Sequence, residues 1–578
     1  MRSTRRIEGV AGWLLLALVV VGTAWGLAHL PPGPAGPRWA GAGEARPRSG
    51  GTFVFYGSSN VRTLDPHIAY DELSNMAVRL VFDGLLDYDL EGRIVPSLAE
   101  SLPSISEDGR TFRFVLRRGV RFHHGRELSA EDVRWSLEHL LASDTGSPGV
   151  PFFLTIAGAQ EFHEGRARSI TGVRVIDRYT IDITLTQPDQ TFLNAMAMTF
   201  AYPVAREVYE RWGSQVGAHP VGTGPFVFDR WERGVQLEFE RNRAYFRRDH
   251  VGPDRMIYLE GIDVSLAVPR FRNGDLDVLH GMTNTQYLFF KGSREWRPYF
   301  HEMPSVTVTG LVMNCEMAPF DDVHVRRAVS FAIDREARVR MANRRIRAAG
   351  QMLPPQIAGY DEHLPNLQHF DLEAARREMA LAGHPDGLPD EVTVTVGEGP
   401  GGLLSFAILQ EDLRRIGIRI RPRQVSFATY LDETARPRTS QAFFSGWNMD
   451  FPDPSNFLDI LLHSRSIRPE NSENRSFYRN PELDRVLDEA RSERDPGRRV
   501  ALYRQANDLV ARDAPWAFTS YPLKTELHQA YVHGYVPHPV WSQDYRNVWL
   551  DLPRRRLADR ARGTGRFGAA LAPLGGRR

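Results

Sequence analysis

The sequence contains almost no cysteine or lysine. Cys315 is the only cysteine among 578 residues, which excludes an intramolecular disulfide and any metal site made of several thiolates. It lies in an apolar stretch, so we interpret it as a core residue. Lys291 and Lys524 are the only lysines, and arginine supplies nearly all of the 72 basic residues. With 71 acidic residues the formal net charge is +1, so bulk electrostatics gives no reason to expect a nucleic-acid partner.

Catalytic motifs are also missing. The sequence has no Gly-x-Ser-x-Gly motif and no Ser/His/Asp or Cys/His spacing of a known hydrolase. The grouped histidines are His123, His124, His528, His533 and His538. Adjacent histidines on a strand point to opposite faces, and positions five apart share neither a helical face nor a strand face. We therefore expect no enzyme activity and no metal bound by these histidines.

An acidic segment at residues 87–92 begins like a calcium-binding loop, with acidic side chains at alternate positions and Gly92 in sixth place. The twelfth position is Leu98, where such a loop needs a bidentate glutamate. The segment therefore indicates a turn between two strands.

One long apolar run is present, at about residues 10–28, and it follows Arg2, Arg5 and Arg6. A basic segment before an apolar run is typical of an export signal. About 18 apolar residues also suffice to span a bilayer. Residues 1–30 are therefore either a cleaved signal peptide or an uncleaved membrane anchor, and no cysteine follows to carry a lipid. Both alternatives place the rest of the chain outside the cytoplasm.

The remaining chain is long enough for two or three domains. Residues 31–49 are rich in Pro, Gly and Ala and indicate a linker. Residues 554–578 form a basic, Gly-rich tail without periodicity, which predicts disorder. Alternating apolar residues predict strands around 112–116, 181–185 and 235–239. Ser129 followed by Asp132 predicts a capped helix start.

A β-strand, a helix and a second strand are predicted at 392–396, up to 416, and 418–420, which indicates a partly parallel sheet. The loop 397–402 between them fits the Gly-x-Gly-x-x-Gly pattern of dinucleotide sites. The acidic residue expected after the second strand is missing, because residues 421–425 read Arg-Pro-Arg-Gln-Val. An enzyme acting on a nucleotide is therefore a weaker alternative, although the free N–H groups of Gly399 and Gly401 favour an anion.

Eight ordered blocks between about residues 50 and 550 carry a family resemblance. They are Thr-Leu-Asp-Pro-His at 63–67, Val-Phe-Asp-Gly-Leu at 81–85, Val-Pro-Ser-Leu-Ala at 95–99, Phe-His-His-Gly at 122–125, Ser-Ala-Glu-Asp-Val at 129–133, Gly-Thr-Gly-Pro-Phe at 222–226 with Arg-Asn at 241–242, Val-Arg-Arg-Ala at 325–328 with Ile-Asp-Arg at 333–335, and Gly-Trp at 446–447 with Phe-Pro-Asp-Pro at 451–454. The set resembles the family 5 solute-binding proteins of ABC importers, which include oligopeptide-, dipeptide- and nickel-binding members.

This resemblance implies an α/β fold of the type II periplasmic-binding-protein class, with two lobes plus an extra domain and mixed sheets with helices on both faces. The implied first lobe comprises 50–77, 216–308 and 525–553, the appended domain 78–215, and the second lobe 309–524. Hinge closure would trap a solute, and the closed monomer would dock on an ABC permease in the inner membrane. No cofactor is implied.

The resemblance also implies site residues. Asp450, which shortly follows the Gly-Trp pair, corresponds to the acidic residue that receives a peptide's ammonium group. Its alternative role is to cap a turn before Pro452. Trp447 would line the pocket or else pack in the core. Further cleft candidates are Tyr56, Asn314 and Asn448.

The sequence departs from the family's pattern at one place that bears on the ligand. The family's dipeptide binders carry an arginine after the strand that corresponds to 392–396, and segment 397–402 has none. We therefore expect longer peptides or another solute, with the N–H groups of the glycine loop holding any anionic end. A nickel chelate as solute and a membrane-anchored sensor that does not transport remain alternatives.

Overall fold

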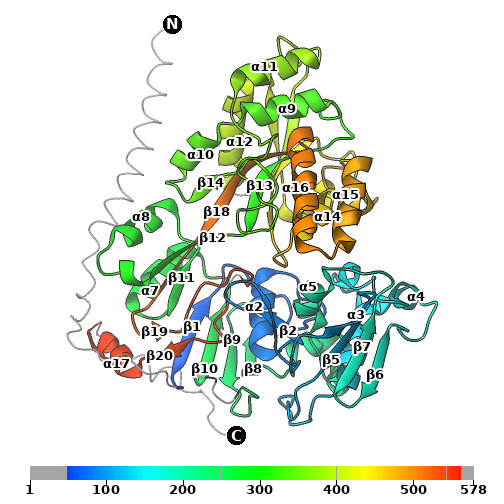
Figure 1. The fold of residues 1–578 in the computed structure, drawn as a ribbon. Helices are drawn as coiled ribbons and strands as arrows, with labels where there is room; N and C mark the ends of the chain where they lie inside the picture. Colours follow the sequence, from blue (N-terminus) through cyan, green and yellow to red (C-terminus); the bar gives the residue numbers. More distant parts are fainter. Residues whose placement is uncertain (1–48, 248–249, 251, 399, 542, 562–578) are drawn as a thin grey trace.

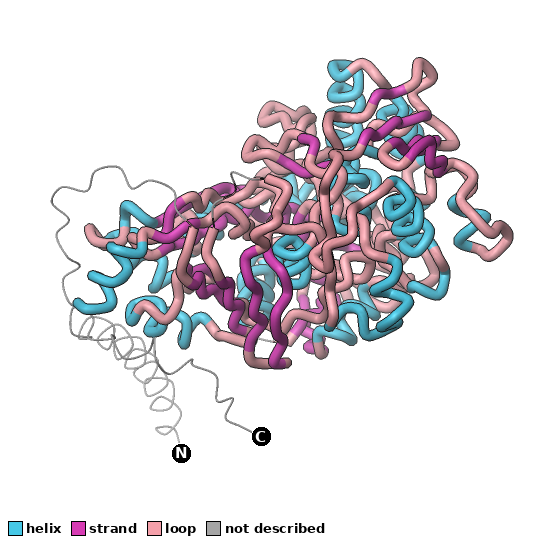
Figure 2. The backbone as a smooth tube through the Cα atoms, turned by 90° about the horizontal axis from the view of Figure 1, so that it is seen from below, coloured by secondary structure: helices cyan, strands magenta, loops and turns pink. Residues whose placement is uncertain are grey.

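The computed structural model describes residues 49–247, 250, 252–398, 400–541 and 543–561. The predicted export segment, Gly399 and nearly all of the predicted linker lie outside these ranges. Among the described residues, no helix is both long enough and apolar enough to cross a membrane. The described chain forms three parts, and strands and helices are interspersed in each of them (Figures 1 and 2).

The first lobe, at the lower left of Figure 1, is built on a four-stranded sheet in the order β1-β10-β9-β8. β1 and β10 are parallel, and the other pairs are antiparallel. Its elements are β1 (Thr52–Tyr56), α2 (Glu72–Val81), β8 (Phe226–Glu232), β9 (Gln236–Arg241), β10 (Arg255–Leu259), α7 (Val264–Asn273), β11 (Val278–His280), α8 (Asn284–Gly292), β12 (Phe300–Pro304), β19 (Val532–His533), β20 (Trp549–Leu550) and α17 (Leu552–Ala561).

The appended domain, at the lower right of Figure 1, has the sheet β4-β5-β7-β6 and a β2–β3 hairpin. Its elements are β2 (Leu86–Tyr88), β3 (Ile94–Pro96), β4 (Ser104–Ile105), β5 (Thr111–Val115), α3 (Ala130–Leu141), η2 (Val150–Phe152), α4 (Ala159–His163), β6 (Val173–Asp177), β7 (Thr180–Thr184), α5 (Phe192–Ala197) and α6 (Arg206–Trp212). The predicted turn at 87–92 is confirmed as the hairpin connection. The predicted capping box of Ser129 and Asp132 is confirmed at the start of α3.

The second lobe, at the top of Figure 1, is built on the strands β13, β15, β16 and β17. Its elements are β13 (Thr307–Met313), α9 (Val323–Ala332), α10 (Arg335–Met341), β14 (Ile346–Ala348), α11 (Leu372–Leu381), β15 (Val392–Gly397), α12 (Pro400–Arg414), β16 (Ile420–Val425), α13 (Phe427–Thr434), β17 (Ala442–Asn448), α14 (Ser455–Leu462), α15 (Pro481–Ser492) and α16 (Pro496–Asp513). β15 and β16 are parallel with α12 between them, as the sequence predicts.

The two lobes are joined by a ribbon of neighbouring strands. β18 (Trp516–His528) pairs with β13 and β14 at one end and with β11 and β12 at the other, so it runs through both lobes (Figure 1). β12 leads into β13 alongside it, and the Ser305 N–H donates to the Pro522 carbonyl at 2.9 Å. Relative motion of the lobes must therefore bend this ribbon.

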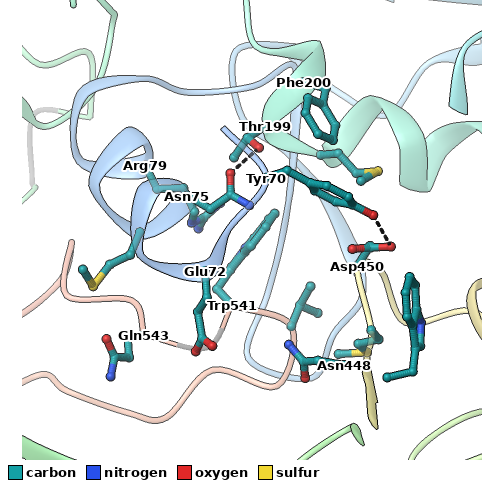
Figure 3. A pocket seen from close by; sticks show the side chains of 15 residues that line it. Tyr70, Glu72, Asn75, Arg79, Thr199, Phe200, Asn448, Asp450, Trp541 and Gln543 are labelled. Atoms are coloured by element: carbon teal, nitrogen blue, oxygen red, sulfur yellow. Dashed lines mark hydrogen bonds between the residues drawn. The ribbon is translucent and has the colours of Figure 1, made fainter. Parts of the chain in front are cut away.

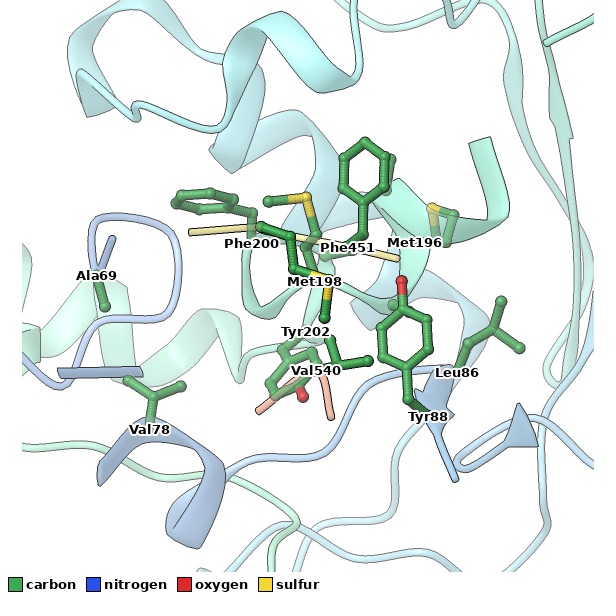
Figure 4. Close-up of a cluster of buried hydrophobic side chains, with 14 of the residues drawn as sticks. Ala69, Val78, Leu86, Tyr88, Met196, Met198, Phe200, Tyr202, Phe451 and Val540 are labelled. Atoms are coloured by element: carbon green, nitrogen blue, oxygen red, sulfur yellow. The ribbon is translucent and has the colours of Figure 1, made fainter. Parts of the chain in front are cut away.

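An apolar cluster contains buried side chains from all three parts of the molecule (Figure 4). Val78 of α2 and Leu86 of β2 belong to it, together with Met198, Phe451 and other buried side chains. Phe451 follows β17 of the second lobe, so the cluster includes residues from all three parts. The remaining labelled members are Ala69, Tyr88, Met196, Phe200, Tyr202 and Val540.

The predicted disorder after residue 553 is wrong for residues 554–561, which belong to α17. The Leu552 side chain lies against Gly51 at the start of β1. Arg554 donates to the Tyr299 hydroxyl at 2.9 Å, and Arg555 donates to the Thr52 carbonyl. These contacts hold a helix that composition alone does not predict. The tail beyond residue 561 lies outside the described ranges.

A buried charge network ties the C-terminal segment to α2 and the β2 strand. Arg79 contacts Asp87 at 3.2 Å and Asp544 at 3.0 Å, and Arg546 contacts the same two carboxylates at 2.9 and 2.7 Å. Burial opposes ionisation of Asp87, but the two guanidinium groups overcome that penalty and hold its pKa below the ordinary value. Trp541 donates to Asp87 at 3.0 Å and lies under the Arg79 guanidinium, 3.8 Å from the ring centroid.

Replacing Arg546 with methionine should therefore leave Asp87 and Asp544 undercompensated in the interior. We expect the free energy of unfolding to fall by about 3 to 5 kcal/mol, measured by denaturant unfolding followed through tryptophan fluorescence. Arg93→Met is the matched control, because Arg93 pairs with Asp89 on the surface and should matter little. Equal effects of the two substitutions would contradict a structural role for the network.

Candidate functional site

A cavity of about 340 Å³ opens between the second lobe and the first lobe, beside the appended domain (Figure 3). Four chain segments line it: the start of α2, the stretch before Tyr202, the end of β17, and the segment after Val540. The lining residues are Tyr70, Glu72, Asn75, Met76, Arg79, Met198, Thr199, Phe200, Trp447, Asn448, Met449, Asp450, Val540, Trp541 and Gln543. Side chains from distant parts of the sequence therefore meet at one place.

Asp450 is the acidic side chain that the second lobe presents to this cavity. Its Oδ2 accepts a hydrogen bond from Asn456 Nδ2 at 3.0 Å. It also accepts one from the Tyr70 hydroxyl at 3.3 Å (Figure 3). Its backbone N–H donates to Asn456 Oδ1 at 2.9 Å. Asn456 thus fixes both the main chain and the carboxylate, while Tyr70 approaches from the opposite wall.

Burial raises the pKa of Asp450 to about 6, although the hydrogen bonds from Asn456 and Tyr70 lower it. Burial and the nearby Asp450 raise the pKa of Tyr70 well above its ordinary value, so Tyr70 stays a hydrogen-bond donor. Near neutral pH the cavity therefore contains a carboxylate that is largely ionised but poorly solvated. Such a group gains from an incoming cation that donates hydrogen bonds.

The structure brings three of the sequence-predicted residues to the cavity, namely Asp450, Trp447 and Asn448. Trp447 is half-buried, and its Nε1 donates to Asn456 at 3.1 Å, so it forms part of the wall and also packs on the core. Asn448 is exposed and accepts from the Thr307 hydroxyl at 2.9 Å, next to the ribbon between the lobes.

The other predicted residues lie elsewhere. Tyr56 is buried on β1, where its hydroxyl donates to the His280 carbonyl at 2.8 Å. Asn314 is buried beyond the end of β13 and donates to the Ser440 carbonyl at 3.0 Å. Neither lines the cavity, because both satisfy backbone groups inside a lobe. Gly401 is in the first turn of α12, and Gly399 lies outside the described ranges.

Sequence reasoning missed Tyr70, Trp541 and Asn456. Tyr70 packs on Phe200 with 5.4 Å between ring centroids, and Trp541 is held by Arg79 and Asp87. Tyr70 closely follows the 63–67 block, which was its only signal. Asn456 is two residues after the 451–454 block, but no pattern there indicates that its amide contacts Asp450.

The cavity is suited to binding a solute. Apolar and aromatic side chains provide most of its wall, and Asp450, Glu72 and Gln543 provide polar groups. Among the described lining residues none is serine, cysteine or histidine. Within the described ranges, no group of three or more His, Cys, Asp or Glu side chains is placed to hold a metal ion.

Two lobes joined by a strand ribbon, with a mostly apolar cavity between them, define a solute-binding protein. The comparison with known families agrees: residues 93–468 match the family described as "Bacterial extracellular solute-binding proteins, family 5 Middle". The match covers more than half of the chain, so this protein belongs to that family.

Named relatives extend the comparison. The chain is 28% identical over 477 residues to Di/tripeptide-binding protein 2 of Pseudomonas aeruginosa, covering 79% of this chain and 87% of the relative. It is 27% identical over 527 residues to Heme-binding protein A of Haemophilus influenzae, covering 88% and 94%. The solved structure of clavulanic acid biosynthesis oligopeptide binding protein 2 is 27% identical, with a TM-score of 0.80 over 87% of this chain and 96% of that one. The predicted fold class is confirmed.

Tyr70→Phe should raise the pKa of Asp450 above about 6, because the hydroxyl that stabilises the carboxylate is lost. The folded-state pKa already exceeds that of an exposed aspartate, so the free energy of unfolding falls as pH rises through this range. The fall should extend to higher pH in the variant. A carboxyl-selective NMR titration measures the shift. Tyr179→Phe, which removes a 3.1 Å hydrogen bond to Glu127, should leave Asp450 unchanged.

Proposed function

We propose that this protein captures peptides between its two lobes outside the cytoplasm and delivers them to an ABC permease. The observation that carries the proposal is the Asp450 carboxylate, held by Asn456 and Tyr70 at the wall of the cavity between the lobes. Family membership supports binding rather than catalysis. The named relatives bind different solutes, so the peptide is argued from the site.

A peptide's ammonium group fits this carboxylate. The ammonium would take the place of the water that the Asp450 carboxylate lacks in the cavity wall. It would pair with that carboxylate by charge-assisted hydrogen bonds. Tyr70 and Trp541 offer aromatic surface to the adjoining side chains. Recognition of the terminal ammonium group fixes the position of the first residue and selects little among peptide sequences.

We propose peptides longer than two residues. Segment 397–402 has no arginine to clamp the carboxylate of a dipeptide. A second, larger cavity shares Tyr70 with the first one, so further space lies next to the first cavity.

Closure of the lobes over the solute is supported by a latch between the second lobe and the appended domain. Arg491 of α15 contacts Asp189, just before α5, at 2.7 Å, and the Asp189 side chain is only 2% exposed. Arg494 donates to the Glu107 carbonyl at 2.7 Å. These contacts lie far from the ribbon that joins the lobes, so opening the lobes would break them.

We propose that the protein acts outside the cytoplasm and that it does so as a monomer. The cleaved signal and the uncleaved anchor both remain predictions for residues 1–30, which lie outside the described ranges.

Asp450→Asn should weaken binding of trialanine by about 2 kcal/mol, because a partly buried ammonium loses its ionic partner. N-acetyltrialanine, which has no ammonium, should bind wild type weakly and lose nothing further in the variant. Isothermal titration of both peptides with both proteins gives the coupling energy directly. Equal losses for the free and the acetylated peptide would rule out Asp450 as the amine site.

The control for this cycle is Asp432→Asn, on α13, where the carboxylate pairs with Arg436 at 2.9 Å and is exposed.

Trialanine binding by wild type should also weaken about tenfold from about pH 7 to about pH 5, as Asp450 takes up a proton.

Dialanine should bind less tightly than trialanine or tetra-alanine. Preferential binding of dialanine would overturn the proposed length.

Arg491→Met should weaken trialanine binding about tenfold by reducing the population of the closed form. Small-angle scattering of the ligand-free variant should give a larger radius of gyration than wild type. Arg113→Met is the matched control, because Arg113 contacts Asp182 at 2.7 Å within the appended domain. Unchanged affinity and scattering in Arg491→Met would show that the latch does not favour closure.

A further inference from the structure

A second cavity, of about 870 Å³, lies between the appended domain and the second lobe. Residues of η2 and α5 line one side, and residues of α14 and of the segment that follows it line the other. Tyr70 lines both this cavity and the first one. Phe451, immediately after Asp450, also faces the second cavity. The two spaces are therefore neighbours, separated by aromatic side chains.

Asp459 of α14 is the unusual group in the wall of this second cavity. The residue is 6% exposed, and its Oδ1 is buried without a hydrogen-bond partner among the described residues. Its Oδ2 receives one long hydrogen bond, 3.4 Å, from Arg465 Nη2. A buried carboxylate with so few partners is costly, so a ligand that supplies hydrogen bonds there gains more than it would in water.

The neighbouring arginines compensate Asp459 only in part, because Arg465 pairs with it at 3.4 Å and each arginine has a closer carboxylate. Arg491 contacts Asp189 at 2.7 Å. Arg499 contacts Asp453 at 2.8 Å. Arg465 contacts Asp488 at 2.6 Å. Burial accordingly raises the pKa of Asp459 to about 7, even though the arginines lower it. The group that would complete this site is a further cation.

The cavity wall also suits the stem of a long basic side chain. Phe152, Leu154 and Ile460 line it together with Asp459. Arginine and lysine side chains bury an aliphatic stem along apolar surface and pair their charged end with an acid. An aliphatic solute without a charge would leave Asp459 as poorly paired as it is now.

We propose that the second cavity is a subsite for a cationic side chain of the bound peptide, with its guanidinium or ammonium group paired with Asp459. The subsite rests on the proposed peptide-binding function and adds a preference that Asp450 cannot provide, since Asp450 binds a group that every free peptide has. The preferred solutes are basic peptides.

The test uses tetra-alanine peptides in which one position at a time carries arginine or its neutral isostere citrulline. Wild type should bind the arginine peptide about 10- to 100-fold more tightly than the citrulline peptide at one position. The lysine and norleucine pair should repeat the preference there. Less than about twofold discrimination at every position would overturn the subsite.

Asp459→Asn should abolish this discrimination and leave tetra-alanine binding unchanged, whereas Asp432→Asn should retain it. Discrimination that persists in Asp459→Asn would assign the preference to another group and overturn the role of Asp459. Because wild type alone reveals the preference, a variant that fails to fold does not block the test. If tetra-alanine binds without any preference for a cation, only the subsite fails. If none of these peptides binds, the proposed function fails with it.

Discussion

The buried contact of Arg79 and Arg546 with Asp87 and Asp544 is the constraint on which the site depends. It brings the C-terminal segment against α2, so that Trp541 lies under the Arg79 guanidinium and faces the cavity. The same helix follows directly on Tyr70, which reaches Asp450 across the cavity. Two opposing walls are thus positioned by one electrostatic cluster, in an interior where unpaired charges would be prohibitive.

The ribbon of β12, β13 and β18 limits how the two lobes can move relative to each other. Since β18 pairs with strands of both lobes, the lobes share one continuous hydrogen-bonded connection, and the cavity lies to one side of it. Asn448 contacts Thr307 where this ribbon enters the second lobe. Closing is thereby restricted to a bend around a defined line, while the latch of Arg491 and Asp189 forms on the far side.

Much of the fold could be predicted from the sequence, because strand alternation, the Ser129 cap and the 392–420 unit are local patterns. The site was only partly predictable. Asp450, Trp447 and Asn448 follow a recognisable block, whereas Trp541 reaches the cavity through a tertiary contact that leaves no periodic trace. Tyr56 and Asn314 lie at strand ends, but their polar atoms satisfy backbone groups within a lobe. Residues 554–561 form a helix through contacts with β1 and Tyr299 that composition does not encode.

The large sequence separation of the site's contacts has a consequence for folding. The Tyr70 and Asp450 side chains are 380 residues apart in the chain, and Asp87 and Trp541 are 454 apart. Closing such long loops costs entropy that is recovered only when all three parts have docked. A partly folded chain therefore lacks the complete cavity. Solute binding then acts as a check on assembly, since it stabilises only those molecules in which both ends of the chain have found each other.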